Sequence, residues 1–326
     1  MAHTESNLHV VLGSGPAGTA LATELAHRGH PVRLVDRAGQ GAAPAGVDRM
    51  RGDVSTPEGA AAAVHGAGVV YHCVNVAYQL QVEVMPRIQR AVLGAAEAEG
   101  ARLVVLDTLY PYGRTGGEVM TEETPWRATT HKGRMRAELD EIYLAAHREE
   151  RASVVLGRSA DFVGPGVLNS TLGAAVFPGA LTGGEVLTMG DIDLPHSYTD
   201  IRAVAAGLAT LGESPHGDGR VWHLPTAPAR TTREILGMIE DRVGRPLKIV
   251  TLDAPRAFGP FDEVFMGAYA EMFYQHTEPQ IMDSRAFEAA FRTAPVALGD
   301  TVDATLAWYR GLLAKQAWHP ARAATR

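Results

Sequence analysis

The sequence predicts an α/β fold with a doubly wound parallel sheet, followed by a smaller C-terminal α/β lobe. Strand-like and helix-like segments alternate from Leu8 to Leu156. The strand-like segments are continuous apolar runs, which is typical of parallel strands buried on both faces. The connections between them are short, as is usual in βα units. These three features together favour a sheet with helices on both sides.

The first half of the chain supplies the elements of this sheet in order. Leu21 and Leu25 share one face of the first expected helix, and Gly29 ends it. The expected strands are Leu8–Leu12, Pro31–Val35, a short one before Gly52, Val69–Val74, Arg102–Leu106 and Ala152–Leu156. The expected helices are Thr19–Arg28, Glu58–His65, Gln79–Glu99 and Lys132–Glu149.

After residue 158 the alternation loosens, and glycine and proline become more frequent. We expect residues 1–157 to form the first domain and residues 158–326 to form mainly the second lobe, which would bind substrate. The expected elements there are the helices Ser197–Leu211, Thr232–Val243, Asp283–Phe291 and Thr301–Leu313, with a strand over Arg220–Leu224.

Composition narrows the class of protein. The chain is 46% hydrophobic and 21% charged, with a net charge of −7 and no long basic run, which argues against nucleic acid or an anionic membrane surface as partner. Cys73 is the only cysteine, so a reducing compartment is expected. Neither a signal-peptide pattern nor an apolar run of membrane-spanning length is evident. We therefore expect a cytoplasmic protein, and the high alanine, glycine and arginine content suggests a bacterial source.

The turn after the first strand carries the clearest binding signal. It reads Gly13-Ser14-Gly15-Pro16-Ala17-Gly18 and leads into the first helix. In this strand–turn–helix context, Gly-x-Gly-x-x-Gly is the Rossmann dinucleotide fingerprint. Gly13 makes the tight turn, Gly15 lets the backbone approach a pyrophosphate, and Gly18 allows close packing of helix on strand. The residues expected at the cofactor are Gly13, Gly15, Pro16, Ala17 and Gly18.

Three further residues bear on which dinucleotide binds. Asp36 ends the second strand, where a carboxylate accepts hydrogen bonds from the ribose 2′-OH of NAD and repels the 2′-phosphate of NADP. Arg37 beside it could clamp that phosphate or be a solvated loop charge. Asp53 could reach the adenine or cap its own loop. NAD or NADP is expected, with NAD favoured by Asp36.

The chain resembles the extended short-chain dehydrogenase/reductase superfamily, in its NAD-dependent epimerase/dehydratase branch. Besides the glycine fingerprint, the resemblance is carried by Leu106–Gly113, by Lys132, by the Val163–Gly166 turn and by His196–Ile201. It implies that a segment near 190–225 returns to the first domain. It also implies a small hydroxyl- or carbonyl-bearing substrate, and homodimers are common in the superfamily.

The resemblance breaks at the catalytic pair. The family uses Tyr-x-x-x-Lys, in which tyrosine moves the proton and lysine holds the nicotinamide ribose. This chain reads Ala128-Thr129-Thr130-His131-Lys132, so Ala128 occupies the tyrosine position and the chain looks like an atypical member. Tyr110 is the first candidate to replace the tyrosine, with Thr108 binding the reacting oxygen and Lys132 positioning the ribose. His131 could carry the proton instead, although adjacent helix residues point about 100° apart.

Other residues have both a functional and a structural interpretation. The substrate candidates are Tyr78, Tyr112, Asn169 and His196. In the structural interpretation, Tyr112 packs in the core, Asn169 caps a turn, and His196 makes its hydrogen bonds within the protein. Arg158 and Asp161 read as ion-pair or capping residues and His223 as core. The cluster Met266, Met272, Phe273, Tyr274 and His276 could line a pocket or pack. No metal signature is present in the sequence.

The expected function is therefore an NAD(P)-dependent oxidoreductase or epimerase. The sequence is also compatible with two alternative functions. One is a non-redox isomerase or lyase that uses the same cleft. The other is a dinucleotide-sensing binding protein without turnover.

Overall fold

The central feature of the computed structural model is a seven-stranded sheet in the order β11-β6-β5-β4-β1-β2-β3. The structure describes residues 7–40, 43–259 and 261–315. All pairings in this sheet are parallel. The strands are β1 (His9–Leu12), β2 (Val32–Asp36), β3 (Val47–Arg51), β4 (Val69–His72), β5 (Arg102–Thr108), β6 (Val154–Ser159) and β11 (Val221–His223).

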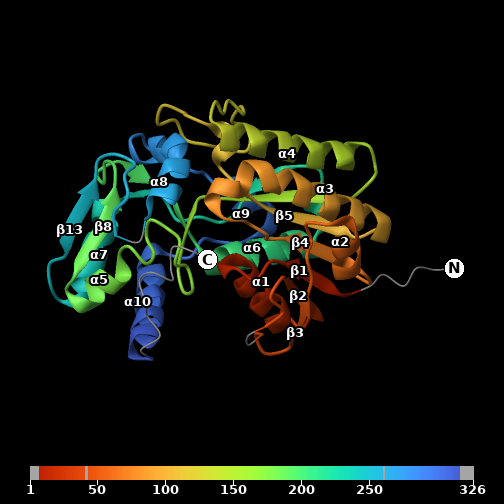
Figure 1. Cartoon of the computed structure of the whole chain (residues 1–326), viewed down its shortest axis with the longest axis horizontal. Coiled ribbons are helices and arrows are strands. Elements are labelled where there is room, and N and C mark those ends of the chain that lie inside the picture. Colours follow the sequence, from red (N-terminus) through yellow and green to blue (C-terminus); the bar gives the residue numbers. More distant parts are fainter. Residues whose placement is uncertain (1–6, 41–42, 260, 316–326) are drawn as a thin grey trace.

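Helices cover both faces of the sheet (Figure 1). One face packs against α1 (Pro16–His27) and α6 (Ile201–Glu213), which also pack on each other. The opposite face packs against α2 (Pro57–Val64), α3 (Gln81–Glu99) and α4 (His131–Arg148). The predicted doubly wound sheet is confirmed.

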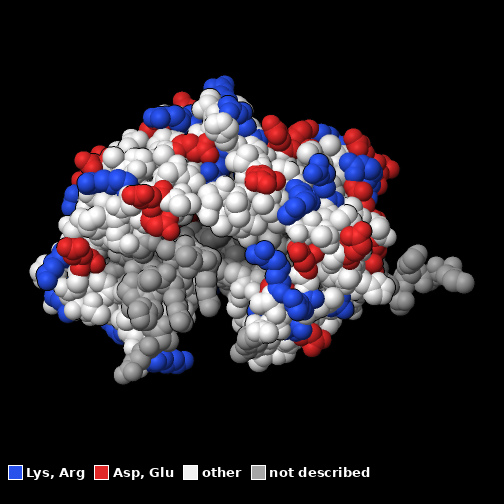
Figure 2. Space-filling model, viewed as in Figure 1, with Lys and Arg blue, Asp and Glu red and all other residues white. Residues whose placement is uncertain are grey.

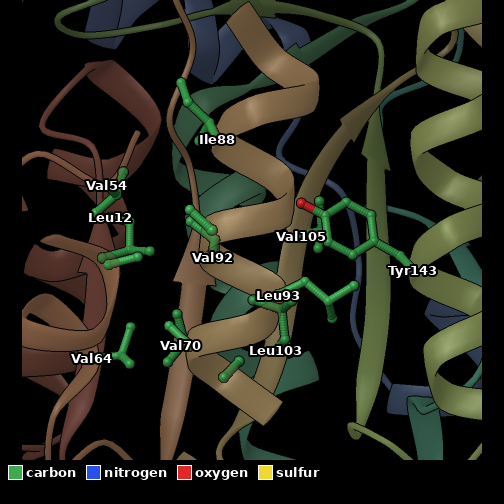
Figure 3. Packing of buried hydrophobic residues seen from close by; sticks show 14 of the residues in the cluster. Leu12, Val54, Val64, Val70, Ile88, Val92, Leu93, Leu103, Val105 and Tyr143 are labelled. Carbon is green, nitrogen blue, oxygen red and sulfur yellow. The ribbon is translucent and has the colours of Figure 1, made fainter. Parts of the chain in front are cut away.

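Alternate residues of each strand feed the two cores, because successive strand side chains point to opposite faces. Val11 joins the α1–α6 core, whereas Leu12 joins the α2–α3–α4 core. Figure 3 shows the second of these, where Leu12 and Val70 from the strands face Val92 of α3. Full burial on both sides explains why the strands read as unbroken apolar runs.

A second lobe lies beside the sheet in space (Figure 1), and its segments come from before and after β11 in the chain. Its core joins α5 (Phe177–Thr182), α7 (Thr232–Val243) and α10 (Leu298–Ala314) with the parallel pair β8 (Glu185–Met189) and β13 (Lys248–Leu252). No helix within the three described ranges is long and apolar enough to cross a membrane.

Short elements connect the two lobes. Two small ladders pair β7 (Asp161–Val163) with β10 (Tyr198–Asp200), and β9 (Pro195–His196) with β12 (Arg230–Thr231). The remaining helical elements are η1 (Tyr78–Leu80), η2 (Tyr110–Tyr112), η3 (Pro215–Gly217), α8 (Glu263–Tyr269), η4 (Ala270–His276) and α9 (Arg285–Phe291). The methionine and aromatic cluster noted in the sequence is buried in α8 and η4, where Tyr78 and Tyr110 pack against it. It links this segment to the strand ends.

Three predicted helix starts were wrong by three or four residues, and one of them is the last helix, which was expected from Thr301 and begins at Leu298. The helix expected from Ser197 begins at Ile201, because Tyr198–Asp200 pair with β7 and the Asp200 carboxylate then accepts from the Arg202 N–H as an N-cap. The first helix begins at Pro16 rather than Thr19. Proline suits the first helical position, where its missing N–H would have no intrahelical partner. The glycine turn therefore forms part of the helix start itself.

Candidate active site

The glycine turn has the geometry that a close approach to phosphate requires. Gly13 has φ +99°, and a Cβ there would lie 2.8 Å from the Cys73 carbonyl oxygen. A Cβ on Gly18 would lie 1.8 Å from the Gly13 carbonyl oxygen, whereas one on Gly15 would meet open space. Among the described residues no side chain caps the start of α1 at Gly15. The exposed first turn thus offers backbone N–H groups and the positive end of the helix dipole to an anion.

The different surroundings of these glycines give a prediction. We expect Gly18→Ala to destabilise the protein by about 1–3 kcal/mol, because the turn must open to admit the methyl group. Gly15→Ala should leave the melting temperature nearly unchanged and only weaken dinucleotide binding. Thermal unfolding together with a titration with NADH or NADPH measures both effects. Equal melting temperatures for the two variants would contradict the packing role of Gly18.

Asp36, which ends β2, makes more contacts than the sequence indicates. Its Oδ1 accepts from the N–H groups of Ala38 at 2.9 Å and Gly39 at 2.8 Å, and its Oδ2 accepts from Arg49 Nε at 2.8 Å. Burial alone would raise the pKa of Asp36, but the Gly39 N–H and Arg49 outweigh it and hold the pKa below its usual range. Arg49 also lies 3.4 Å from Ser14 Oγ in the glycine turn. The Arg49 guanidinium therefore contacts both Asp36 and the glycine turn.

The sequence did not single out Arg49, although the alternation along β3 could have placed it on the same side as the ribose carboxylate. The structure places Arg37 on the surface, where its carbonyl oxygen accepts from Arg51 Nε at 3.2 Å. Asp53 is also exposed and accepts from the Ser55 N–H at 3.0 Å. This contact is the loop cap that was the alternative interpretation of Asp53.

Two tyrosines meet at the carboxyl ends of neighbouring strands. Tyr78 follows β4 and Tyr110 follows β5, and their hydroxyl oxygens lie 3.3 Å apart. Thr108 ends β5, and its Oγ1 accepts from the Tyr110 N–H at 3.4 Å. Burial raises the pKa of both phenols. The structure thus brings together Thr108, Tyr110 and Tyr78, with both tyrosines in their protonated form at neutral pH.

Lys132 approaches the same place from the first turn of α4. Its Nζ lies 4.6 Å from the centre of the Tyr78 ring. The ammonium donates to Glu271 Oε1 at 3.0 Å and to the Ala268 carbonyl oxygen at 2.8 Å. The side chain is almost fully buried under the segment formed by α8 and η4. Lys132 is therefore near the phenols but already paired.

Glu271 has two functions at this point. Besides Lys132, it accepts from the His131 N–H at 2.6 Å and so caps the start of α4. Burial alone would raise the pKa of Glu271, but Lys132 and the His131 N–H hold it below its usual range. His131 itself has 77% of its side chain exposed. The structure places it on the surface, away from the two phenols.

Ala128 lies outside the helix that carries Lys132. Thr130 is the N-cap of α4, and Ala128 precedes it in the loop, where its N–H donates to the Pro111 carbonyl oxygen at 3.1 Å. Residue 128 and Lys132 therefore do not share a helical face. The neighbour of Lys132 at i+4 on α4 is Arg136, which is also buried.

Tyr112 belongs to a buried cluster beneath the strand ends rather than to the phenol pair. Its hydroxyl oxygen lies 2.6 Å from His223 Nε2, and its ring centre lies 4.6 Å from the Arg158 guanidinium carbon. Arg158 is fully buried and donates to Asp107 and Asp140 at 2.6 Å each. The ion-pair interpretation of Arg158 and the core interpretation of His223 are confirmed.

His196 and Asn169 have different surroundings. His196 Nε2 lies 3.1 Å from Asp161 Oδ2, and its ring stacks on that of His276. His276 Nε2 in turn lies 2.6 Å from the Tyr269 hydroxyl oxygen, and burial lowers the pKa of His276 to about 4. His196 is thus a satisfied histidine on the second lobe. Asn169 is exposed in a bend.

The two lobes leave a hollow between them on the face that Figure 2 shows. Charged side chains of both signs are scattered over the rest of this face and do not form a single patch.

Several solved structures have the same fold. DesIV of Streptomyces venezuelae, a dTDP-glucose 4,6-dehydratase solved with NAD, matches with a TM-score of 0.78 and 19% identity, over 96% of this chain and 99% of that one. The UDP-glucose 4-epimerase of Thermus thermophilus in complex with NAD gives 0.75 and 20%, over 93% and 99%. MoeE5 in complex with UDP-glucose and NAD gives 0.76 and 19%, over 94% and 99%.

A comparison with curated proteins found no match. The model of the NAD dependent epimerase/dehydratase family, in contrast, matches residues 10–223. The matched region contains the glycine turn, both tyrosines at the strand ends and all of α4. The chain therefore belongs to the NAD dependent epimerase/dehydratase family.

Proposed function

We propose that the protein is an NAD(P)-dependent oxidoreductase or epimerase that acts on a small hydroxyl- or carbonyl-bearing substrate. One observation carries this proposal. Thr108, Tyr110 and Tyr78 lie together at the carboxyl ends of β4 and β5, and β4 is the direct neighbour of β1 with its glycine turn. Ligands of doubly wound sheets bind at this edge. A proton donor thus stands where the reactive end of a dinucleotide would be.

The cofactor fits the first half of the site. The backbone around Gly13, Gly15 and Gly18 would hold its pyrophosphate, and Asp36 with Arg49 would meet the adenosine ribose. When bound, the nicotinamide would accept or deliver a hydride at a substrate carbon. The side chains of the protein would bind the reacting substrate oxygen and transfer its proton.

The side chains have separate tasks in this proposal. Thr108 donates a hydrogen bond to the reacting substrate oxygen, and Tyr110 gives or takes its proton. Tyr78 supports the Tyr110 hydroxyl at 3.3 Å, and the Lys132 ammonium over the Tyr78 ring favours negative charge that develops on the phenols. Lys132 acts here as a positioning residue, because Glu271 and Ala268 already occupy two of its three N–H groups.

The experiment is to incubate the purified protein with NADH or NADPH and a panel of carbonyl compounds, and separately with NAD⁺ or NADP⁺ and UDP-glucose, whose hydroxyl groups need the oxidised cofactor, because MoeE5 has been solved with that compound. Nicotinamide absorbance reports net redox, and mass spectrometry and NMR report products without it. Turnover with loss of reduced cofactor indicates an oxidoreductase. A new stereoisomer without net redox indicates an epimerase.

The Lys132–Glu271 contact favours one alternative, a dinucleotide-binding protein without turnover. That contact holds α8 and η4 against the start of α4 and leaves no free lysine among the described residues of the site. Tight binding of the cofactor with no product across the panel would support the alternative over the proposal.

A further inference from the structure

Arg136 is a buried cation without an acidic partner in the described part of the chain. Its side chain lies on α4 with a relative exposure of 7%. Its Nε is buried and makes no hydrogen bond to any described residue, and no ion pair to Arg136 forms within the described ranges. Arg158 is buried as well but has two carboxylates. An Nε–H group that has lost its water without gaining an acceptor is unfavourable in the free protein.

The position of Arg136 suggests what supplies the missing acceptor. It follows Lys132 by one helical turn, on the face of α4 that packs on η2, where a Cβ on Gly133 would lie 2.8 Å from the Tyr110 carbonyl oxygen. Its charge affects the pKa values of His72, Tyr110 and Tyr143. No described carboxylate lies within ion-pair distance of Arg136.

His72 places the guanidinium relative to the cofactor turn. It ends β4 and pairs in register with Leu12, the residue before Gly13. Burial, followed by the charge of Arg136, lowers the pKa of His72 to about 3, so the imidazole is neutral. The charge of Arg136 thus acts on the end of β4, the strand that lies between β1 with its glycine turn and β5 with Thr108. A dinucleotide that begins at the glycine turn and reaches Thr108 passes over this point.

We propose that Arg136 binds the nicotinamide-nucleotide half of the cofactor, donating to its ribose hydroxyls and phosphate. This inference rests on the proposed function. It gives Arg136 the ribose-holding task that the sequence assigned to Lys132, whose ammonium is already paired with Glu271. A guanidinium presents five N–H donors in a fixed plane, which suits a phosphate next to a diol.

The test compares Arg136→Met with Arg136→Lys and with Arg134→Met, a matched control on the exposed face of the same helix. Titration calorimetry measures binding of NADH and of AMP, which lacks the whole nicotinamide nucleotide with its phosphate. NADPH and adenosine 2′,5′-bisphosphate replace them if the wild type prefers NADPH. We expect Arg136→Met to weaken the dinucleotide about ten- to hundredfold and the fragment less than about twofold. Arg136→Lys should recover part of the loss, and Arg134→Met should bind as the wild type does.

A second measurement separates binding from folding. Because Arg136→Met removes an unpaired buried charge, the ligand-free variant should melt at the wild-type temperature or above it. The inference is overturned if Arg136→Met binds the dinucleotide as the wild type does, if it weakens the fragment equally, or if it melts lower. A wild type that binds neither dinucleotide would instead reject the proposed function and this inference together.

Discussion

Replacement of Tyr110 by phenylalanine is expected to lower kcat by about 10²- to 10⁴-fold, the usual contribution of a positioned acid or base. Tyr110 adjoins Thr108 at the end of β5, and its hydroxyl lies 3.3 Å from that of Tyr78. Burial raises the pKa of Tyr110, while the Tyr78 hydroxyl lowers it, so the phenol holds its proton at neutral pH and can deliver it. Steady-state kinetics on the substrate found in the carbonyl panel measures the loss.

Two other tyrosines make this result specific. Tyr78→Phe should reduce kcat less than Tyr110→Phe, because Tyr78 acts through Tyr110. Tyr112→Phe should leave the chemical step unchanged, since its hydroxyl bonds to His223 in the buried Arg158 cluster. Dinucleotide affinity should be the same in all three variants. A Tyr110→Phe enzyme with wild-type kcat would exclude Tyr110 as the proton donor.

The sequence predicts the sheet well because the patterns that identify a strand or a glycine turn involve only residues close together in the chain. Apolar runs and the spacing of Gly13, Gly15 and Gly18 depend on neighbours along the chain, and every strand of the sheet except the edge strand β3 is buried as its composition requires. The start of the helix expected from Ser197 was misplaced for the opposite reason. Tyr198–Asp200 pair with β7, which is distant in sequence, and this tertiary pairing overrides the helical pattern.

The site could be predicted only in part. Residues that follow neighbouring strands meet at one edge of a parallel sheet, so the grouping of Thr108, Tyr110 and Tyr78 follows from the order of elements. The Lys132–Glu271 pair does not, because its partners are 139 residues apart and join two lobes. Nothing in the sequence distinguishes Arg136 from the other arginines of the chain either. A helical arginine is usually exposed, and only the packed structure shows that no described carboxylate meets this one.

The buried Arg158 cluster should give the second large effect. We expect Arg158→Met to lower the free energy of unfolding by about 3–5 kcal/mol, the usual cost of leaving one partner of a buried ion pair uncompensated. Asp107 would lose its cation in a site with 1% exposure. Burial and the Asp107 charge already raise the pKa of Asp140, so that carboxyl group can be protonated. Urea unfolding measures the difference.

Arg148→Met is the matched control, because its partner Glu141 and Arg148 itself are more than half exposed. An exposed pair contributes about 1 kcal/mol at most. Adding Asp107→Asn to Arg158→Met should restore part of the lost stability, since it removes the uncompensated charge. If Arg158→Met and Arg148→Met unfold at the same urea concentration, the cluster does not stabilise the fold. Through Asp107 and Asp140, Arg158 connects β5 to α4. Because β5 carries Thr108 and α4 carries Lys132 and Arg136, the cluster holds these site residues at a fixed distance from one another.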